Sequence, residues 1–229
     1  MQSGAGTCCQ MPRNCNFRWV RSLASDNIEK PGLIREIDTK SNYMTFKENI
    51  FKIRQQITDL DRNYFHDHAI TLTRRSTEPK ERLMVCLLAF AIHADQTLFL
   101  RNSPYQEGEP DLWQAGETGA IDLWINVGFP AENLIRKACD RATRVIIYTY
   151  GGKVAHEWWD QHSDTLEQLT NLTIINLPFV TSKALARLAQ RNMQLTCTIN
   201  GGQIWLDNQH DTVQVELTLL KMGTSPNPD

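Results

Sequence analysis

Residues 108–130, GEPDLWQAGETGAIDLWINVGFP, contain two carboxylates, Asp111 and Asp122, that are each followed by Leu-Trp. Asp122 lies in an apolar run, residues 120–129, where an unpaired charge is costly to bury. Such a carboxylate needs a partner, coordinates a metal ion, or lies on an exposed face. The stretch is therefore a candidate site for metal-assisted chemistry, and a hydrogen-bonded structural aspartate is the alternative.

Residues 120–129 predict a β-strand, whose side chains alternate between two faces. We expect Ile121, Leu123, Ile125 and Val127 to point into a core, and Asp122, Trp124, Asn126 and Gly128 to point to the opposite face. At about 3.3 Å per residue, the Cα atoms of Asp122 and Asn126 would lie about 13 Å apart. These two short side chains cannot easily share one metal ion, so Asp111 or Glu81 would have to approach one of them.

The patterns around this strand predict a mixed α/β (α+β) fold. Strands are expected at 46–60, 64–76, 97–101, 144–151 and 172–179, followed by three alternating runs at 193–199, 203–206 and 212–220. Helices are expected at 76–94, 130–142, 153–169 and 182–191, the first and last beginning at Ser or Thr caps. The expected architecture is a mixed central sheet flanked by helices, with a C-terminal antiparallel meander.

Composition narrows the class of protein. The chain has 229 residues and a formal net charge of −2, so no overall positive field attracts it to nucleic acid or anionic lipid. Its longest apolar run, residues 83–92, falls far short of the ~20 residues that a membrane span needs. Cys86, Cys139 and Cys197 stand singly in periodic segments, which favours free thiols in a reducing cytoplasm. Residues 1–43 lack periodicity and predict a disordered extension, so that residues 44–229 form a single domain.

Three motifs, DLDRNYFHDHAITLTRRSTEPKERLMVCLLAF, GAIDLWINVGFP and IRKAC, resemble the YaeQ family of small bacterial proteins. The resemblance extends from about Phe46 to near Leu220, nearly all of the expected domain. It implies a fold like that of the PD-(D/E)XK nuclease superfamily, whose core is a helix, a three-stranded meander, a helix and a further strand. In that superfamily an Asp and a Glu hold Mg²⁺, and a nearby Lys positions the attacking water. Hard divalent cations favour such oxygen ligands, and a bound ion can activate water.

Five residues correspond to that catalytic set. Asp111, after Pro110, resembles the first motif carboxylate, and Asp122 is a second candidate. Asn126 occupies the place of the second acid, so the resemblance gives Asp111, Asp122 and Asn126 as metal ligands for Mg²⁺ or Mn²⁺. Glu81 resembles an accessory acid, and Lys137 stands in for the missing lysine. The family usually has Glu at position 126, and an amide there would weaken metal binding.

Each of these residues also has a structural interpretation. Glu81 can favour the N-terminus of a helix, Lys137 can be a solvated charge, and Asp111 can be a turn or cap residue. Other constellations are weaker: His66-Asp67-His68 lacks a third zinc ligand, and Gly151-Gly152 lacks a phosphate-binding fingerprint. Four basic residues around one expected helix, Arg136, Lys137, Arg141 and Arg144, could contact phosphates or form a solvated face.

Two functions follow from these observations. The first is a binding or regulatory module that keeps the nuclease-like fold with a degenerate metal site, and it is favoured by Asn126. The alternative is a Mg²⁺-dependent nuclease or phosphodiesterase acting on nucleic acid. The partner would be nucleic acid or a protein, without a membrane, and an enzyme would be a metal-dependent nuclease. A small-molecule site in the same cleft has no specific support.

Overall fold

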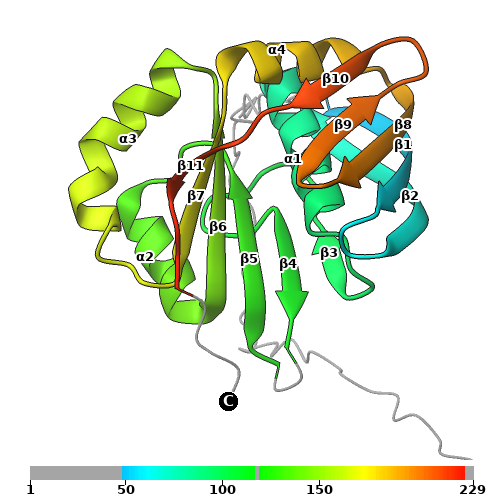
Figure 1. Cartoon of the computed structure of the whole chain (residues 1–229). Helices are drawn as coiled ribbons and strands as arrows, with labels where there is room; N and C mark the ends of the chain where they lie inside the picture. Colours follow the sequence, from blue (N-terminus) through cyan, green and yellow to red (C-terminus); the bar gives the residue numbers. More distant parts are fainter. Residues whose placement is uncertain (1–47, 117–118, 225–229) are drawn as a thin grey trace, which may run out of the picture. The chain divides into compact units, whose positions relative to one another are not determined.

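The structure, a computed structural model, describes residues 48–116 and 119–224. The disordered extension predicted for residues 1–43 lies outside the described residues. Within the described ranges the fold is mixed α+β, with two mixed sheets and four helices (Figure 1). No helix there is long and apolar enough to cross a membrane.

The first sheet has five strands in the order β10-β9-β8-β1-β2. They are β1 (Glu48–Asp59), β2 (Tyr64–Arg75), β8 (Asn192–Asn200), β9 (Gln203–Asp207) and β10 (Thr212–Val215). β1 and β2 form a long antiparallel hairpin, and β8, β9 and β10 form the C-terminal antiparallel meander. β8 pairs with β1 in parallel, which joins the hairpin to the meander. The N-terminal hairpin and the β8–β10 meander therefore meet in one sheet.

The second sheet has six strands in the order β11-β7-β6-β5-β4-β3. They are β3 (Leu98–Leu100), β4 (Leu112–Ala115), β5 (Ile121–Val127), β6 (Ala142–Tyr150), β7 (Leu172–Leu177) and β11 (Thr218–Lys221). β3, β4 and β5 are antiparallel neighbours, whereas β5, β6 and β7 are parallel. The candidate residues Asp111 and Asn126 lie on the β4–β5 part of this sheet, where the antiparallel and parallel parts meet.

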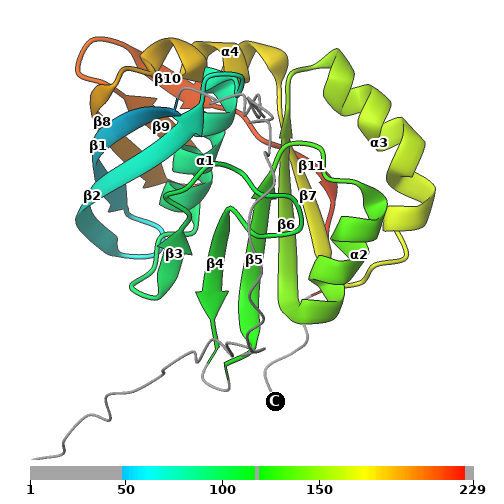
Figure 2. The ribbon, with the colours of Figure 1, turned by 180° about the vertical axis from the view of Figure 1, so that it is seen from behind.

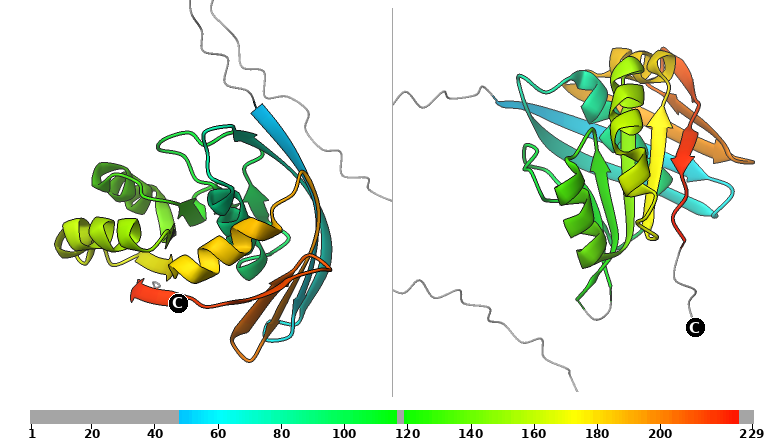
Figure 3. Two further views of the ribbon diagram at one scale, coloured as in Figure 1. Left: turned by 90° about the horizontal axis from the view of Figure 1, so that it is seen from above. Right: turned by 90° about the vertical axis from the view of Figure 1, so that its left-hand side faces the viewer.

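Four helices cover the sheets: α1 (Lys80–Ile92), α2 (Glu132–Arg141), α3 (Lys153–Leu166) and α4 (Phe179–Leu188). The five-stranded sheet curves around α1 and α4 (Figure 3). All nine residues of α1 from Leu83 to Ala91 are buried, because this helix packs between the two sheets in the larger core cluster. Seen from behind, α2 and α3 lie along the other face of the six-stranded sheet (Figure 2). They enclose a second, smaller core cluster around Trp124 and Trp158.

Several details differ from the sequence predictions. Two sheets replace the single central sheet. Residues 212–220, predicted as one strand, divide into β10 and β11, which pair in different sheets. Strand β4 was not predicted, since it is only four residues long and follows a loop rich in Pro and Gly. The predicted Ser and Thr caps are wrong: Pro79 and Pro178, both with extended ψ angles, precede α1 and α4 without a side-chain cap.

Candidate functional site

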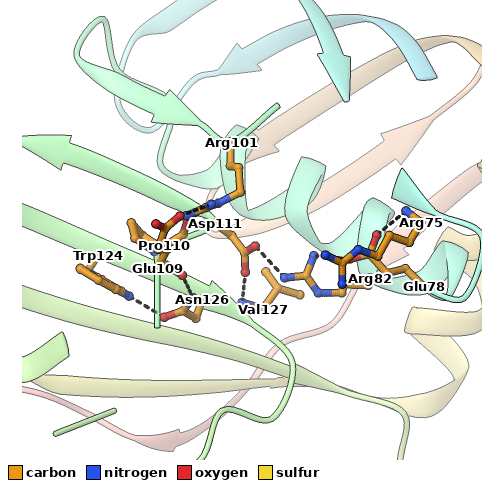
Figure 4. Close-up of polar contacts among 10 residues, drawn as sticks. All are labelled: Arg75, Glu78, Arg82, Arg101, Glu109, Pro110, Asp111, Trp124, Asn126 and Val127. Atoms are coloured by element: carbon orange, nitrogen blue, oxygen red, sulfur yellow. Dashed lines mark hydrogen bonds and ion pairs between the residues drawn. The ribbon is translucent and has the colours of Figure 1, made fainter. Parts of the chain in front are cut away.

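Asp111 lies just before β4, and only 4% of its side chain is exposed. Its Oδ1 accepts a hydrogen bond from Nη2 of Arg82 at 2.6 Å, and its Oδ2 accepts one from the backbone N–H of Val127 at 2.8 Å (Figure 4). The Asp111 backbone N–H donates to the carbonyl of Ile125 at 2.9 Å. Both carboxylate oxygens therefore have partners, and they tie the β4–β5 pair to helix α1.

Arg82 comes from the first turn of α1, and 16% of its side chain is exposed. It approaches a second carboxylate, Glu78, at 3.7 Å, and its guanidinium carbon lies 4.6 Å from the ring centroid of Tyr105. A buried arginine needs such counterions because removing a charge from water is expensive. Of the two carboxylates, Asp111 lies closer to Arg82 and is more buried than Glu78. The Arg82–Asp111 pair is therefore an integral part of the core.

A small cavity of about 40 Å³ lies beside this ion pair. Its lining includes Arg74, Glu78, Arg82, Cys86 and Asp111. Within the described part of the chain, Arg74 Nε and Glu78 Oε1 are buried without a hydrogen-bond partner. Because water needs a polar site of at least ~10–15 Å³, the cavity can hold ordered water between this donor and this acceptor. Burial raises the pKa of the Cys86 thiol, which keeps it neutral and unreactive.

Glu81, the residue before Arg82, is engaged elsewhere. Its Oε1 lies 2.5 Å from Nζ of Lys183 on α4, and 16% of the Glu81 side chain is exposed. The contact joins the first turn of α1 to α4. Tyr150, at the end of β6, lies in the same region, where burial raises its pKa to about 12. The phenol thus stays protonated at neutral pH.

Asn126 is turned toward the second core. Its Oδ1 accepts a hydrogen bond from the indole N–H of Trp124 at 2.5 Å, and its Nδ2 donates to the carbonyl of Glu109 at 2.9 Å (Figure 4). Trp124 and Asn126 share a face of β5, as the alternation predicted. The Asn126 amide therefore fixes an indole ring and the 109–110 loop.

Asp122 lies at an irregularity of the β4–β5 pairing. Leu123 is opposite Gln114, whereas Ile121 is opposite Ala115, so β5 has one extra residue at Asp122. Such a bulge shifts the alternation of side chains. Leu123 belongs to the larger core, as predicted, but Ile121 packs against the smaller cluster, which corrects the expectation that the two share a face. Asp122 is separated from Asn126 along the strand, as expected.

Lys137 lies on α2 and is exposed to solvent. Across residues 48–116 and 119–224, no three His, Cys, Asp or Glu side chains are grouped so as to hold a metal ion. The structure thus brings Asp111 and the 125–127 backbone together, but the five candidates do not converge on one point. Asp111 is bound to Arg82, Glu81 to Lys183 and Asn126 to Trp124. Asp122 lies at a bulge, and Lys137 is exposed to solvent. Their roles in catalysis or metal binding stay predictions.

The cationic partners in this region were not anticipated. Arg82 is distant in sequence from its partner Asp111, and Lys183 is distant from its partner Glu81. Nothing in the composition distinguishes either cation from a solvated charge. One signal was present: Arg82, in the first turn of α1, is followed by nine apolar residues. A charge at such a position has to reach a partner or solvent.

These features define a class: an α+β protein with a buried central helix between two mixed sheets, and with acidic residues held in ion pairs at the start of that helix. A family model described as "YaeQ protein" matches residues 44–217. The chain therefore belongs to the YaeQ family, which confirms the resemblance.

Relatives match over most of their length. "Uncharacterized protein YaeQ" of Salmonella typhi is 38% identical over 175 residues, or 76% of this chain and 97% of that protein. Its Escherichia coli K12 counterpart is 37% identical over the same shares of the two chains. The crystal structure of YaeQ from Xanthomonas axonopodis pv. citri has a TM-score of 0.71 at 35% identity, covering 76% of this chain and 99% of that one. YaeQ from Pseudomonas syringae also has a TM-score of 0.71, at 24% identity, covering 76% and 97%.

Proposed function

We propose that this protein is a binding or regulatory module built on a nuclease-like fold with a degenerate metal site. The observation that carries the proposal is the state of Asp111, whose two oxygens are bound by Arg82 and by the Val127 N–H. The second motif position holds a neutral amide, Asn126, which is bound to Trp124 and Glu109. Asp111 and Asn126, two of the three residues that would form the metal site, are thus engaged in structural contacts.

The order of elements supports a nuclease-like core. Helix α1 is followed by the β3-β4-β5 meander, then by α2 and by β6 parallel to β5. This is the order that the PD-(D/E)XK resemblance implies. Asp111, which resembles the first motif carboxylate, precedes the middle strand of the meander. Glu81, which resembles the accessory acid, lies in the first turn of the helix. Fold does not fix function, so the site chemistry has to decide between binding and catalysis.

Metal binding at Asp111 would disrupt an existing ion pair. A divalent cation would have to displace the guanidinium of Arg82, which would then remain largely buried without its strongest counterion. Breaking a buried pair in this way typically costs about 3–5 kcal/mol. Asn126 could offer only one neutral oxygen in return. The free energy therefore favours the Arg82–Asp111 ion pair over a bound metal ion. A binding module is accordingly favoured over a metal-dependent enzyme.

Isothermal titration of Mn²⁺ into the full chain tests this proposal. We expect no saturable heat from the wild type at millimolar Mn²⁺, and none from Asp111→Asn. The double variant Arg82→Met with Asn126→Glu should gain affinity, because it removes the competing cation and restores a second carboxylate. Lys153→Met, which alters an exposed pair with Glu157, is the matched control. Saturable binding to the wild type that Asp111→Asn abolishes would contradict the proposal.

The alternative is a Mg²⁺-dependent nuclease or phosphodiesterase. One observation favours it: hydrogen bonds connect Asp111 to the backbone of residues 125 and 127, next to the second motif position. Incubation of single- and double-stranded oligonucleotides with Mg²⁺ or Mn²⁺, with and without EDTA, tests it. Metal-dependent cleavage that is lost in Asp111→Asn would establish the enzyme. Cleavage retained in that variant would identify a contaminating nuclease.

A further inference from the structure

Three aromatic side chains form a row across the antiparallel part of the six-stranded sheet. Phe99 on β3 is paired with Trp113 on β4, which is paired with Trp124 on β5. The rings of Phe99 and Trp113 are stacked, with centroids 5.6 Å apart and an interplanar angle of 20°. Burial decreases toward the edge: Trp124 is 2% exposed, Trp113 is half-buried, and Phe99 is 52% exposed. The row therefore begins in the core and ends in solvent.

A groove of about 270 Å³ lies beside two members of this row, Trp113 and Trp124. Its lining is Arg101, Glu109, Pro110, Trp113, Ile121, Trp124 and Arg141. The guanidinium carbon of Arg141, at the end of α2, is 5.2 Å from the ring centroid of Trp124. Lys137 lies four residues earlier on the same helix and is exposed, so it falls on the same face as Arg141. Arg141 thus borders an aromatic floor, and Lys137 is a second exposed cation on the same face of α2.

The walls of this aromatic–arginine groove are held by hydrogen bonds that are part-buried or exposed. Nε and Nη2 of Arg101 donate to the carbonyl of Pro110 at 2.9 and 2.7 Å, and Nη1 pairs with Glu109. Asn126 fixes the Trp124 indole on one side and the Glu109 carbonyl on the other (Figure 4). The groove is thereby preorganised, and a rigid site binds with less loss of conformational entropy.

We propose that the aromatic–arginine groove binds single-stranded nucleic acid. A base would stack on Trp113 and Phe99, and the adjoining phosphate would lie against Arg141 and Lys137. Stacking on exposed aromatic rings combined with cationic contacts to the backbone is the usual mode of single-strand binding. A duplex keeps its bases inside and offers no free face to Trp113. The inference names the ligand of the binding module above and so rests on that proposed function.

Charge supports this ligand over an apolar peptide. The chain has a formal net charge of −2, yet Arg141 lines the groove and Lys137 shares its face of α2. Arg101 is neutralised by Glu109, so the positive charge is concentrated on the α2 side. The position of Asn126 also acquires a role, because its amide aligns Trp124 and the 109–110 loop. An acid there would keep the acceptor for Trp124 but lose the donor to Glu109.

Fluorescence anisotropy of a labelled twelve-nucleotide oligothymidylate or oligouridylate, in EDTA and at low salt, tests the inference. We expect Trp113→Leu to weaken binding by at least about tenfold, since base stacking contributes substantially per base. Arg141→Gln should weaken it by about threefold to tenfold and lower the slope of log affinity against log salt by about 0.7. Arg136→Gln, on the same helix but paired with Glu132, is the matched control and should bind like the wild type. Circular dichroism verifies that each variant is folded.

Four outcomes would overturn the inference. The first three are no anisotropy change with either oligonucleotide at 100-micromolar-scale protein, equal losses in Arg141→Gln and Arg136→Gln, and binding of a duplex as tightly as of the single strand. The fourth is an acidic aromatic peptide that binds in place of the oligonucleotide, which would make a peptide the ligand. Because EDTA is present, none of these results depends on a metal. If neither oligonucleotide binds and the Mn²⁺ titration is flat, the proposed binding module would be retained, but with another partner.

Discussion

The two ends of helix α1 are held in similar ways. At the N-terminal end, Arg82 pairs with Asp111 at 2.6 Å, and Asp111 also accepts the N–H of Val127. At the C-terminal end, Arg62 pairs with Asp59 at 2.6 Å, and Asp59 also accepts the N–H groups of Asp61 and Arg62 at 3.0 Å. Each end thus has a buried aspartate that binds one arginine and at least one backbone donor.

The comparison helps to interpret Asp111. Asp59 belongs to no catalytic motif, and its side chain is 2% exposed. Arg62 donates to the carbonyls of Ala94 and Ala91 at 3.1 and 3.3 Å, so it satisfies groups that a helix C-terminus leaves unpaired. Asp111 has the same kind of partners as this structural residue. The motif position therefore needs no metal to account for its buried charge.

The ends differ in solvent exposure, and this difference sets the expected energies. Arg62 is 42% exposed, whereas Arg82 is 16% exposed. Solvent screens an exposed pair and can hydrate a cation left alone, but it cannot do so for a desolvated one. Disruption should therefore be costlier at the N-terminal end.

Asp111→Ala should have the largest effect. It leaves Arg82 without its closest counterion and the Val127 N–H without an acceptor, so we expect the free energy of unfolding to fall by about 3–5 kcal/mol. Urea denaturation followed by circular dichroism measures the change. A fall of less than about 1 kcal/mol would mean that solvent or Glu78 compensates the guanidinium, and that the two ends are less different than their exposure implies.

His93 provides a pH test of the C-terminal end. Its Nε2 lies 2.8 Å from the hydroxyl of Tyr148. Burial, with the nearby charges of Arg62 and Arg144, lowers the pKa of His93 to about 4. The unfolded state, with a pKa near 6.5, binds more protons between these values. The contribution of His93 to stability is thus present above about pH 6.5 and is lost as the pH falls toward 4.

We expect this group to make the wild type about 2 kcal/mol less stable at pH 5 than at pH 7. His93→Gln can retain a hydrogen bond to Tyr148 but cannot titrate, so its difference between the two pH values should be smaller by that amount. Urea denaturation at both pH values gives the comparison. Equal pH dependence in the two proteins would show that His93 is protonated normally in the folded state.

Arg62→Met should lower the free energy of unfolding by about 1 kcal/mol, less than Asp111→Ala. The exposed pair is partly screened, and Asp59 keeps its two backbone donors. The same urea titration tests the prediction. A loss as large as that of Asp111→Ala would remove the proposed distinction between the ends.

Lys183→Met should have the smallest effect, about 0.5 kcal/mol or less. Lys183 is 47% exposed, and pairs of this kind contribute little because solvent screens them. A double-mutant cycle with Glu81→Gln isolates the interaction. A coupling above about 1.5 kcal/mol would instead give Glu81 a fixed structural role like that of Asp111.

Much of the secondary structure followed from local pattern. Strands β1 and β2 and helix α1 were predicted near their observed places, and the turn between β8 and β9 contains Gly201 and Gly202, with φ of 58° and 73°. Alternation and apolar runs report burial directly, and left-handed backbone favours glycine. Family membership also followed from sequence, because ordered motifs extended through the domain.

Sequence did not determine the sheet assignment or the partners of the charges. Periodicity shows that residues 212–220 are extended, but not that they pair with β9 in one sheet and β7 in the other. It shows that Asp111 and Asn126 are polar, but Arg82 and Trp124 were identified as their partners only in three dimensions. Local pattern depends on neighbours in the chain, whereas ion pairs and strand pairing depend on groups that the whole fold brings together. For this protein, sequence determined where the polar residues are, and tertiary structure decided what each one binds.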